Sequence, residues 1–413
     1  MKIRKRALAD PAFNGPYAVS AIAVSFFVFA YSTRLGQISI LIYYSLWFPL
    51  LLVAPRSVIG NWKDLRLPCA IAFWCIISVT WSDAPSVTLR GALQFASHIL
   101  CAVIAARLVS FRSLSLGVVI GCFFVVLYSF GVGNYAVDVI DGSFTFVGAF
   151  ESKNSLGFYS SVCVYFSIVT ISSLRVSWRV RLFCLVTLAP SVIALVWCRS
   201  ATSLASLVGS LTILLGLKFF TRFPPIARTV LLIGLATLSA GIALAGDVLG
   251  LLLRALGKDA TLTGRTYLWS EGIDQIQDHP FLGYGYRAWW IEGRPKAEEL
   301  WELFYIPQKS GFHFHNMYIE TAVEIGVVGL FLFIAVIVVT FARYTRLFLT
   351  TRDFEVPALL GLLVMMIARS FVEVDFLTTY APGSFLMFWM LCSSRELLRS
   401  RGLGRARPKR HPF

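Results

Sequence analysis

Two histidines stand directly before one of the chain's long apolar runs. His313 and His315 are followed by Asn316, and Glu320 and Glu324 lie four and eight residues after Asn316, so these last three side chains share one face of a helix. Histidine can gain or lose a proton near neutral pH. The pattern indicates proton transfer by one of the two histidines; a hydrogen-bonded interfacial histidine is the alternative. We predict no metal site, because no third ligand stands at a diagnostic spacing.

Three basic residues border other apolar runs at points where an anion could bind. Lys153 precedes one run, and Arg199 occupies a tight turn between two others. Arg265 falls in the first turn of a helix predicted to start at Gly264, where free N–H groups and the helix dipole favour an anion. A guanidinium adds a two-pronged phosphate contact there. The three residues predict an anion site; a snorkelling lysine and solvated arginines are the alternatives.

Further charges gather at the end of a later apolar run. Arg369 and Glu373 are four residues apart, and Asp375 follows them. Opposite charges at this spacing are neighbours on a helix surface. The sequence therefore predicts an ion pair between Arg369 and Glu373.

The composition shows what kind of chain must position these residues. Of the 413 residues 57% are hydrophobic, and the mean hydropathy is +0.73, whereas soluble proteins are about 45–50% apolar. The net charge of +15 comes from short basic clusters between apolar runs, which is typical of membrane-protein loops and not of a nucleic-acid-binding domain. The eight cysteines lie in or beside apolar runs without a Cys-x-x-Cys pair, so we expect neither a disulfide framework nor a zinc site.

The apolar runs define a topology, since a membrane span needs about 20 apolar residues. Approximate spans cover residues 16–33, 37–55, 67–81, 90–107, 114–132, 154–173, 182–197, 201–218, 228–250, 318–341, 355–373 and 381–394. With the N-terminus in the cytoplasm, the inside segments carry 25 of the 37 basic residues but only 5 of the 22 acidic ones. The sequence predicts an all-α, polytopic membrane protein of about twelve transmembrane helices, with an uncleaved first helix and both termini cytoplasmic.

Two outside loops are longer than simple connectors and divide the chain. They run from about residue 131 to 153 and from about 251 to 314, and the second contains four tryptophans. Long loops in compact proteins tend to carry function. We predict transmembrane helices 1–9 in residues 1–250, a folded periplasmic loop domain in 251–314 between helices 9 and 10, helices 10–12 in 315–398 and a basic cytoplasmic tail in 399–413.

At this point the motifs resemble those of the O-antigen ligase and polysaccharide polymerase superfamily, membrane glycosyltransferases of the bacterial inner membrane. The resemblance covers residues 140–330, and the remainder of the chain agrees only in helix count. The matching segments are Phe150-Glu-Ser-Lys153-Asn154-Ser-Leu-Gly157, Cys198-Arg199-Ser-Ala-Thr-Ser203, Thr263-Gly264-Arg265-Thr266-Tyr-Leu-Trp269, His279-Pro-Phe-Leu-Gly283-Tyr-Gly285-Tyr286, His315-Asn316-Met-Tyr318-Ile-Glu320 and Glu324-Ile-Gly326-Val-Val-Gly329.

The resemblance implies a mechanism and its partners. Such enzymes move a glycan from an undecaprenyl-diphosphate carrier to an acceptor hydroxyl at the periplasmic face of the inner membrane, with inversion and without a metal or other cofactor. Arg199 and Arg265, helped by Lys153, would bind the pyrophosphate and stabilise the charge on the leaving group. His315 would orient or deprotonate the acceptor hydroxyl, with His313, Asn316 and Glu320 as supporting residues.

The acceptor separates three hypotheses. A polymerase passes the glycan to another lipid-linked repeat, and the Lys-Asn-Ser-Leu-Gly and Ala-Thr-Ser-Leu segments resemble exopolysaccharide-production polymerases. A ligase passes the glycan to lipid A core instead. A flippase or transporter of the same lipid-linked sugar is the third hypothesis, although such proteins more often carry charges in the middle of the membrane. Chain-length regulator and flippase proteins are expected partners of either enzyme.

Overall fold

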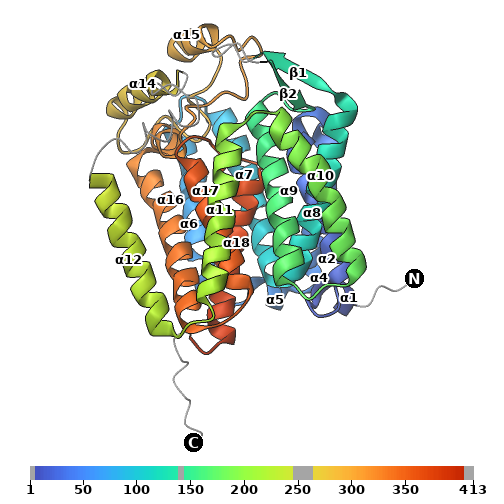
Figure 1. The fold of residues 1–413 in the computed structure, drawn as a ribbon. Helices are drawn as coiled ribbons and strands as arrows, with labels where there is room; N and C mark the ends of the chain where they lie inside the picture. The colour runs from blue at the N-terminus through green and yellow to red at the C-terminus, as the bar shows by residue number, and fades with distance from the viewer. Residues whose placement is uncertain (1–4, 138–143, 245–263, 404–413) are drawn as a thin grey trace, which may run out of the picture.

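The chain folds into a bundle of helices with a small irregular cap at one end (Figure 1). The computed structural model describes residues 5–137, 144–244 and 264–403. We call the end of the bundle that carries β1, β2, α14 and α15 the cap end. The short helix α1 (Lys5–Ala9) and the last turns of α18 (Pro382–Ser400) both lie at the opposite end, as an even number of crossings requires.

A helix occupies each of the twelve intervals in which a span is predicted. Among the described residues, seven helices are long and apolar enough to cross a membrane. They are α2 (Gly15–Leu35), α7 (Pro85–Leu108), α8 (Phe111–Val132), α9 (Lys153–Ser173), α10 (Trp178–Trp197), α11 (Ala201–Phe220) and α16 (Met317–Thr350). The remaining intervals hold α3 (Gln37–Trp47) with α4 (Pro49–Val53), α6 (Arg66–Ile77) with η2 (Ser78–Thr80), α12 (Pro225–Leu244), α17 (Glu355–Ser370) and α18. The prediction of a helical, polytopic membrane protein is confirmed, while the count of twelve spans stays a prediction.

Small residues allow the central helices to pack closely. A Cβ atom on Gly117 of α8 would lie 2.6 Å from the Cβ of Ile22 on α2, and one on Gly121 would lie 2.7 Å from the carbonyl oxygen of Ala23. Two glycines four residues apart on one helix face are a common way for membrane helices to approach each other. The short elements α5 (Pro55–Ile59) and η1 (Trp62–Asp64) connect α4 to α6.

The first long loop forms a hairpin that is not predicted from the sequence. Strands β1 (Asn134–Val137) and β2 (Phe144–Gly148) pair antiparallel, with Tyr135 opposite Phe146. The stacked rings of Tyr135 and Phe144, 4.9 Å between centroids, support the pairing. Such short strands give little sequence signal beside the helical runs, and residues 138–143 lie outside the described chain. The hairpin leads directly into the N-terminus of α9.

The described part of the second long loop has its own small hydrophobic core. It contains α14 (Arg265–Asp278) and α15 (Pro295–Leu303), and α14 begins directly after Gly264, where a helix is predicted to start. Trp289 and Trp301 are fully buried and pack with Leu268 and Phe314. The boundaries predicted for the four domains stay predictions, and residues 245–263 and 404–413 lie outside the described chain.

The cap is fixed to the bundle where α16 breaks. Gly326 interrupts this helix with a φ of +66°, a conformation that favours glycine. The loop before α15 crosses the break, so that the backbone N–H of Gly285 donates to the carbonyl of Glu324 at 2.8 Å. A Cβ on Gly326 would lie only 2.1 Å from the carbonyl oxygen of Phe281. This docking positions the start of α16, and with it the two histidines that precede the helix.

Candidate functional site

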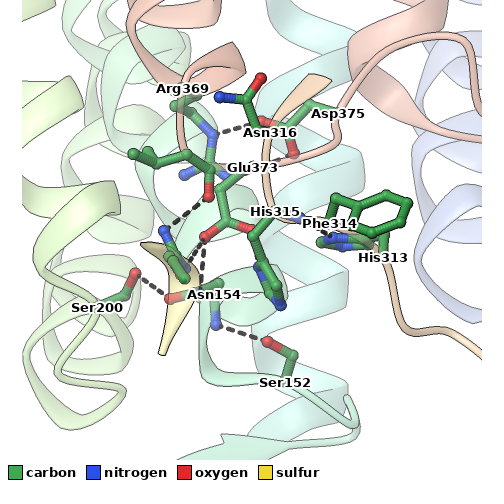
Figure 2. A network of polar contacts seen from close by, with 12 residues as sticks. Ser152, Asn154, Ser200, His313, Phe314, His315, Asn316, Arg369, Glu373 and Asp375 are labelled. Atoms are coloured by element: carbon green, nitrogen blue, oxygen red, sulfur yellow. Dashed lines mark hydrogen bonds and ion pairs between the residues drawn. The ribbon is translucent and has the colours of Figure 1, made fainter. Parts of the chain in front are cut away.

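One carboxylate, that of Glu373, joins three segments that are far apart in the sequence (Figure 2). Its Oε1 accepts a 2.8 Å hydrogen bond from Arg265 at the start of α14 and another of 2.8 Å from Asn154 at the start of α9. Its Oε2 lies 3.7 Å from Nδ1 of His315, just before α16. The structure therefore brings two of the predicted site residues, Arg265 and His315, to a common partner.

Glu373 does not pair with Arg369, so the ion pair predicted from their spacing is wrong. Helix α17 ends at Ser370. The backbone N–H of Glu373 still donates to the carbonyl of Arg369 at 2.8 Å, but it is the carboxylate of Asp375 that reaches the Arg369 guanidinium. Arg369 instead forms a two-pronged ion pair with Asp375, at 2.6 and 3.3 Å, and donates to Ser203 on α11 at 3.0 Å. Arg369 thus anchors the loop, which leaves the Glu373 carboxylate to Arg265, Asn154 and His315.

The turn that carries His315 is held by the polar residues around it. Asn316 caps α16 by accepting hydrogen bonds from the backbone N–H groups of Tyr318 and Ile319 at 3.0 and 3.2 Å. The buried Glu320 accepts one from the backbone N–H of Phe314 at 2.8 Å, and His315 itself adopts a φ of +51°. A non-glycine residue in this conformation needs such support from its surroundings.

His313 lies against His315. The two rings are 4.3 Å apart between centroids, and Nδ1 of His313 accepts a 3.1 Å hydrogen bond from the backbone N–H of His315. His313 therefore fixes the backbone of the neighbouring histidine. The Nδ1 atom of His315 is buried and has no hydrogen-bond partner among the described residues.

Arg199 and Lys153 directly precede Ser200 and Asn154, two residues that border this cluster. Arg199 is exposed in the turn between α10 and α11, with a φ of +50°. Its neighbour Ser200 donates to Asn154 at 2.8 Å, so the turn is tied to the start of α9. Burial raises the pKa of the Cys198 thiol and the Lys153 cation opposes this rise, which places Lys153 near the same turn. The segments that carry the two predicted anion-binding residues are therefore joined by the Ser200–Asn154 hydrogen bond.

The electrostatics of the cluster keep its carboxylate ionised. Burial alone would raise the pKa of Glu373, but the adjacent His315 and the guanidinium groups of Arg265 and Arg369 hold that pKa well below its usual range. Burial, followed by the neighbouring His315 ring, lowers the pKa of His313 to about 3. At neutral pH the cluster thus contains an anionic Glu373 and a neutral His313.

The same residues include a set that could hold a metal ion. One ligand atom each from His313, His315 and Glu373 lies within 4.8 Å of the others, a grouping hidden in the sequence because Glu373 is far along the chain. The Arg265 guanidinium already binds this carboxylate and repels a second cation beside it. A site without a metal therefore stays our prediction.

A pocket of about 640 Å³ opens beside the cluster. Glu373, Asn154, Arg369 and His313 form part of its wall. A volume of this size is within the range of small-molecule sites. A ligand in the pocket would reach the carboxylate that contacts His315.

Two residues of the site were missed or misjudged at the level of sequence. Asn154 stands in one of the quoted motifs without a role, although it links Glu373 to Ser200 in the structure. Glu373 was assigned to the wrong partner. The sequence did offer one signal for Glu373, an acidic residue at the end of a predicted membrane segment. Charged side chains in or near a membrane segment are costly in free energy and tend to be functional.

The comparisons with known proteins agree with this architecture. A family profile described as O-antigen ligase matches residues 183–334. The chain is also 42% identical over 405 residues to the exopolysaccharide production protein ExoQ of Rhizobium meliloti (strain 1021). The aligned region covers 94% of this chain and 90% of that protein. The chain therefore belongs to the O-antigen ligase family of membrane proteins. Within that family it is similar to the exopolysaccharide-production type, so the resemblance predicted from the motifs is confirmed.

The profile match also bears on where the site residues fall. Residues 183–334 include Arg199, Arg265 and His315 but neither Lys153 nor Glu373. The profile match therefore gives no information on Lys153, which lies on α9, or on Glu373, which lies in the loop after α17. The roles of all five residues are proposals.

Proposed function

We propose that this protein is a glycosyltransferase that joins lipid-diphosphate-linked oligosaccharide repeats into a longer glycan. The observation that carries the proposal is the contact between His315 and the ionised Glu373, next to the basic residues Arg199, Arg265 and Lys153. Transfer from such a donor requires a base for the acceptor hydroxyl and, beside it, a binding site for the diphosphate. Membership of the O-antigen ligase family supports a reaction of this class.

The acceptor hydroxyl is activated by His315. Its Nδ1 faces the Glu373 carboxylate at 3.7 Å, which leaves Nε2 to take the proton of the hydroxyl. The anionic Glu373 stabilises the imidazolium that forms and fixes the ring. A separation of 3.7 Å is long for a hydrogen bond, but such contacts often tighten only when the substrate is bound.

The donor is activated through its leaving group. As the acceptor oxygen bonds to the anomeric carbon, the bond from that carbon to the phosphate oxygen breaks, and the lipid diphosphate leaves with the bonding electrons. Arg199 and Lys153 stabilise the charge that develops on it. Arg265 shares its guanidinium between this charge and Glu373. Attack from the face opposite the leaving group inverts the anomeric centre, and no metal or other cofactor takes part.

The distribution of charge supports a location in the bacterial inner membrane with the site on the periplasmic side. The end opposite the cap holds the basic clusters that the positive-inside rule assigns to the cytoplasm. The helix α1 and the last turns of α18 lie at that end, and the site lies at the cap end. An undecaprenyl-diphosphate carrier would present its diphosphate at the membrane surface there.

The similarity to an exopolysaccharide production protein favours a polymerase over a ligase. The similarity to a protein named for exopolysaccharide production supports transfer to another lipid-linked repeat, and transfer to lipid A core is the second candidate, supported by the description of the matching family. We therefore propose that the acceptor is itself a lipid-linked repeat. Chain-length regulator and flippase proteins would act with it.

A complementation experiment tests the proposal. A deletion strain receives the wild-type gene, Arg199→Ala, His315→Ala, or Arg90→Ala as an exposed arginine outside the cluster, at matched membrane levels. We expect long polysaccharide with wild type and Arg90→Ala, and single lipid-linked repeats with the other two. Long lipid-linked polymer that never reaches lipid A core would identify a ligase. Repeats trapped on the cytoplasmic side would identify a transporter, and full complementation by His315→Ala would remove the proposed base.

A further inference from the structure

Exposed apolar side chains lie where the cap crosses the break in α16. Phe281 is 70% exposed and Leu282 is 42% exposed, in the segment between α14 and α15. Just past the break, Val327, Val328 and Phe331 on α16 are 40%, 37% and 70% exposed. Contiguous apolar side chains on a protein surface mark a contact with another protein or with a membrane.

Backbone hydrogen bonds hold this segment of the cap against α16. The N–H of Val327 donates to the carbonyl of Pro280 at 2.9 Å. The N–H of Tyr284 donates to the carbonyl of Val323 at 3.0 Å. One bond lies on each side of the break in α16, and the two exposed cap residues lie between the two bonds along the chain. Their backbone is therefore fixed at the level of the break.

The charges on α16 place this level at the edge of the hydrocarbon core of the membrane. Between Glu324 on the cap side and Arg343 on the other, the 18 residues from 325 to 342 carry no charge. At about 1.5 Å per residue this run is about 27 Å long, close to the thickness of about 30 Å of the hydrocarbon core. Charged side chains are costly inside that core. The break, which stands at the start of the run, therefore lies at the cap-end boundary of the core.

Two tryptophans lie at the same level. The indole N–H of Trp81 donates to the carbonyl of Leu282 at 3.0 Å. The indole N–H of Trp74 donates at 3.0 Å to the carbonyl of Ile325, beside the break, and the two rings are 5.4 Å apart between centroids. Tryptophan is enriched where the hydrocarbon core meets the lipid head groups. The tryptophans therefore agree with the boundary that the charges on α16 define.

We propose that Phe281 and Leu282 insert into the cap-end leaflet of the membrane, just below the lipid head groups, and anchor the cap there. They continue the apolar surface that Val327 and Phe331 of α16 present to the acyl chains, so that lipid covers both. The inference does not depend on the proposed reaction. Because the same segment is bonded to both sides of the break, the anchor sets the height of the cap above the membrane, and with it the height of the turn that carries His315.

Fluorescent labels at equally exposed cap positions test the anchor on the full-length protein in nanodiscs. An environment-sensitive nitrobenzoxadiazole label is attached to Phe281→Cys and, as a matched control, to Tyr305→Cys. Tyr305 is 71% exposed and follows α15, which lies on the side of the cap away from the bundle (Figure 1). All variants carry Cys69→Ser, because Cys69 is exposed and the other seven cysteines are buried. Leu282→Cys provides a second labelled position, and thermal unfolding confirms that each labelled protein is folded.

The label on Phe281→Cys should emit at a shorter wavelength than the label on Tyr305→Cys, because its surroundings are apolar. It should lose intensity to phospholipids that carry a doxyl quencher near the head group, and it should be protected from iodide in the water. A doxyl group at the far end of the acyl chain should quench it less, since the proposed depth is shallow. The label on Tyr305→Cys should be quenched by iodide and not by either doxyl lipid.

Two results would overturn the membrane anchor. One is iodide quenching of the labels on Phe281→Cys and Leu282→Cys to the same extent as the label on Tyr305→Cys, which would place both residues in water. The other is a label on Phe281→Cys that neither iodide nor doxyl lipid reaches, which would show that another protein surface covers this residue in place of lipid. Neither result bears on the proposed transfer reaction.

Discussion

Replacing Glu373 with glutamine is the sharpest perturbation of the site, because it removes one charge and almost no volume. Glutamine can still accept from Arg265 and Asn154, so the local fold should survive. The variant loses the negative charge that faces Nδ1 of His315 at 3.7 Å. The imidazolium formed during proton transfer is then no longer stabilised by an anion.

The distance gives the size of the expected effect. Two unit charges 3.7 Å apart interact by about 4 kcal/mol at an effective dielectric constant of about 20. His315 is 21% exposed and Glu373 7% exposed at their side chains, so solvent screens this interaction only in part. Since about 1.4 kcal/mol corresponds to a tenfold change in rate, we expect Glu373→Gln to lower kcat by a factor of about 10² to 10³.

The KM for the donor provides an independent check on this reasoning. A neutral amide attracts the Arg265 guanidinium less strongly than the carboxylate does, so the positive charge of Arg265 is less neutralised and the donor KM should stay unchanged or fall while kcat drops. Purified variants in nanodiscs with lipid-linked repeats allow both constants to be measured. The variant Glu373→Asp keeps the charge on a shorter side chain and should fall between wild type and Glu373→Gln. A kcat for Glu373→Gln within threefold of wild type would refute the role given to this carboxylate.

Three further predictions follow from the same geometry. Arg199→Ala should raise the donor KM by at least about tenfold, in line with a lost charged hydrogen bond, while Arg90→Ala stays within twofold; equal effects of the two would contradict a specific diphosphate contact. Gly326→Ala should destabilise the folded protein by at least about 2 kcal/mol, because it forces a strained φ and a clash with Phe281. Thermal unfolding would detect this, and Gly216→Ala, where a Cβ meets nothing within 4 Å, should unfold like wild type. Dialysis against a chelator should leave the transfer rate unchanged, and loss of activity restored by a divalent ion would instead assign a metal to the histidine cluster.

The sequence predicts the elements of this fold better than their contacts. Hydrophobic runs placed a helix in each of the twelve expected intervals, because membrane solvation forces apolar segments to satisfy their backbone groups as helices. The start of α14 was also predicted, since Gly264 marks it locally. The β1–β2 hairpin was missed because its strands are only four and five residues long.

The site contains contacts that local sequence patterns do not predict. His315 and Arg265 were recognisable from residue type and position, but their common partner Glu373 was not. The partner predicted for Glu373 was wrong because the loop after Ser370, where α17 ends, brings the Asp375 carboxylate to Arg369 instead. Which side chains meet across the bundle depends on tertiary packing, and the hydrogen bond of Asn154 to Glu373 is a contact of that kind.

The most direct test of the account is the purified protein in nanodiscs with a lipid-diphosphate-linked repeat as its substrate. The products to quantify are the glycosidic bonds formed and the lipid diphosphate released. We predict that one lipid diphosphate is released for each new bond, and that His315→Ala abolishes both while the protein stays folded. Bond formation that persists in His315→Ala, or the absence of any lipid diphosphate release from wild type, would contradict the account.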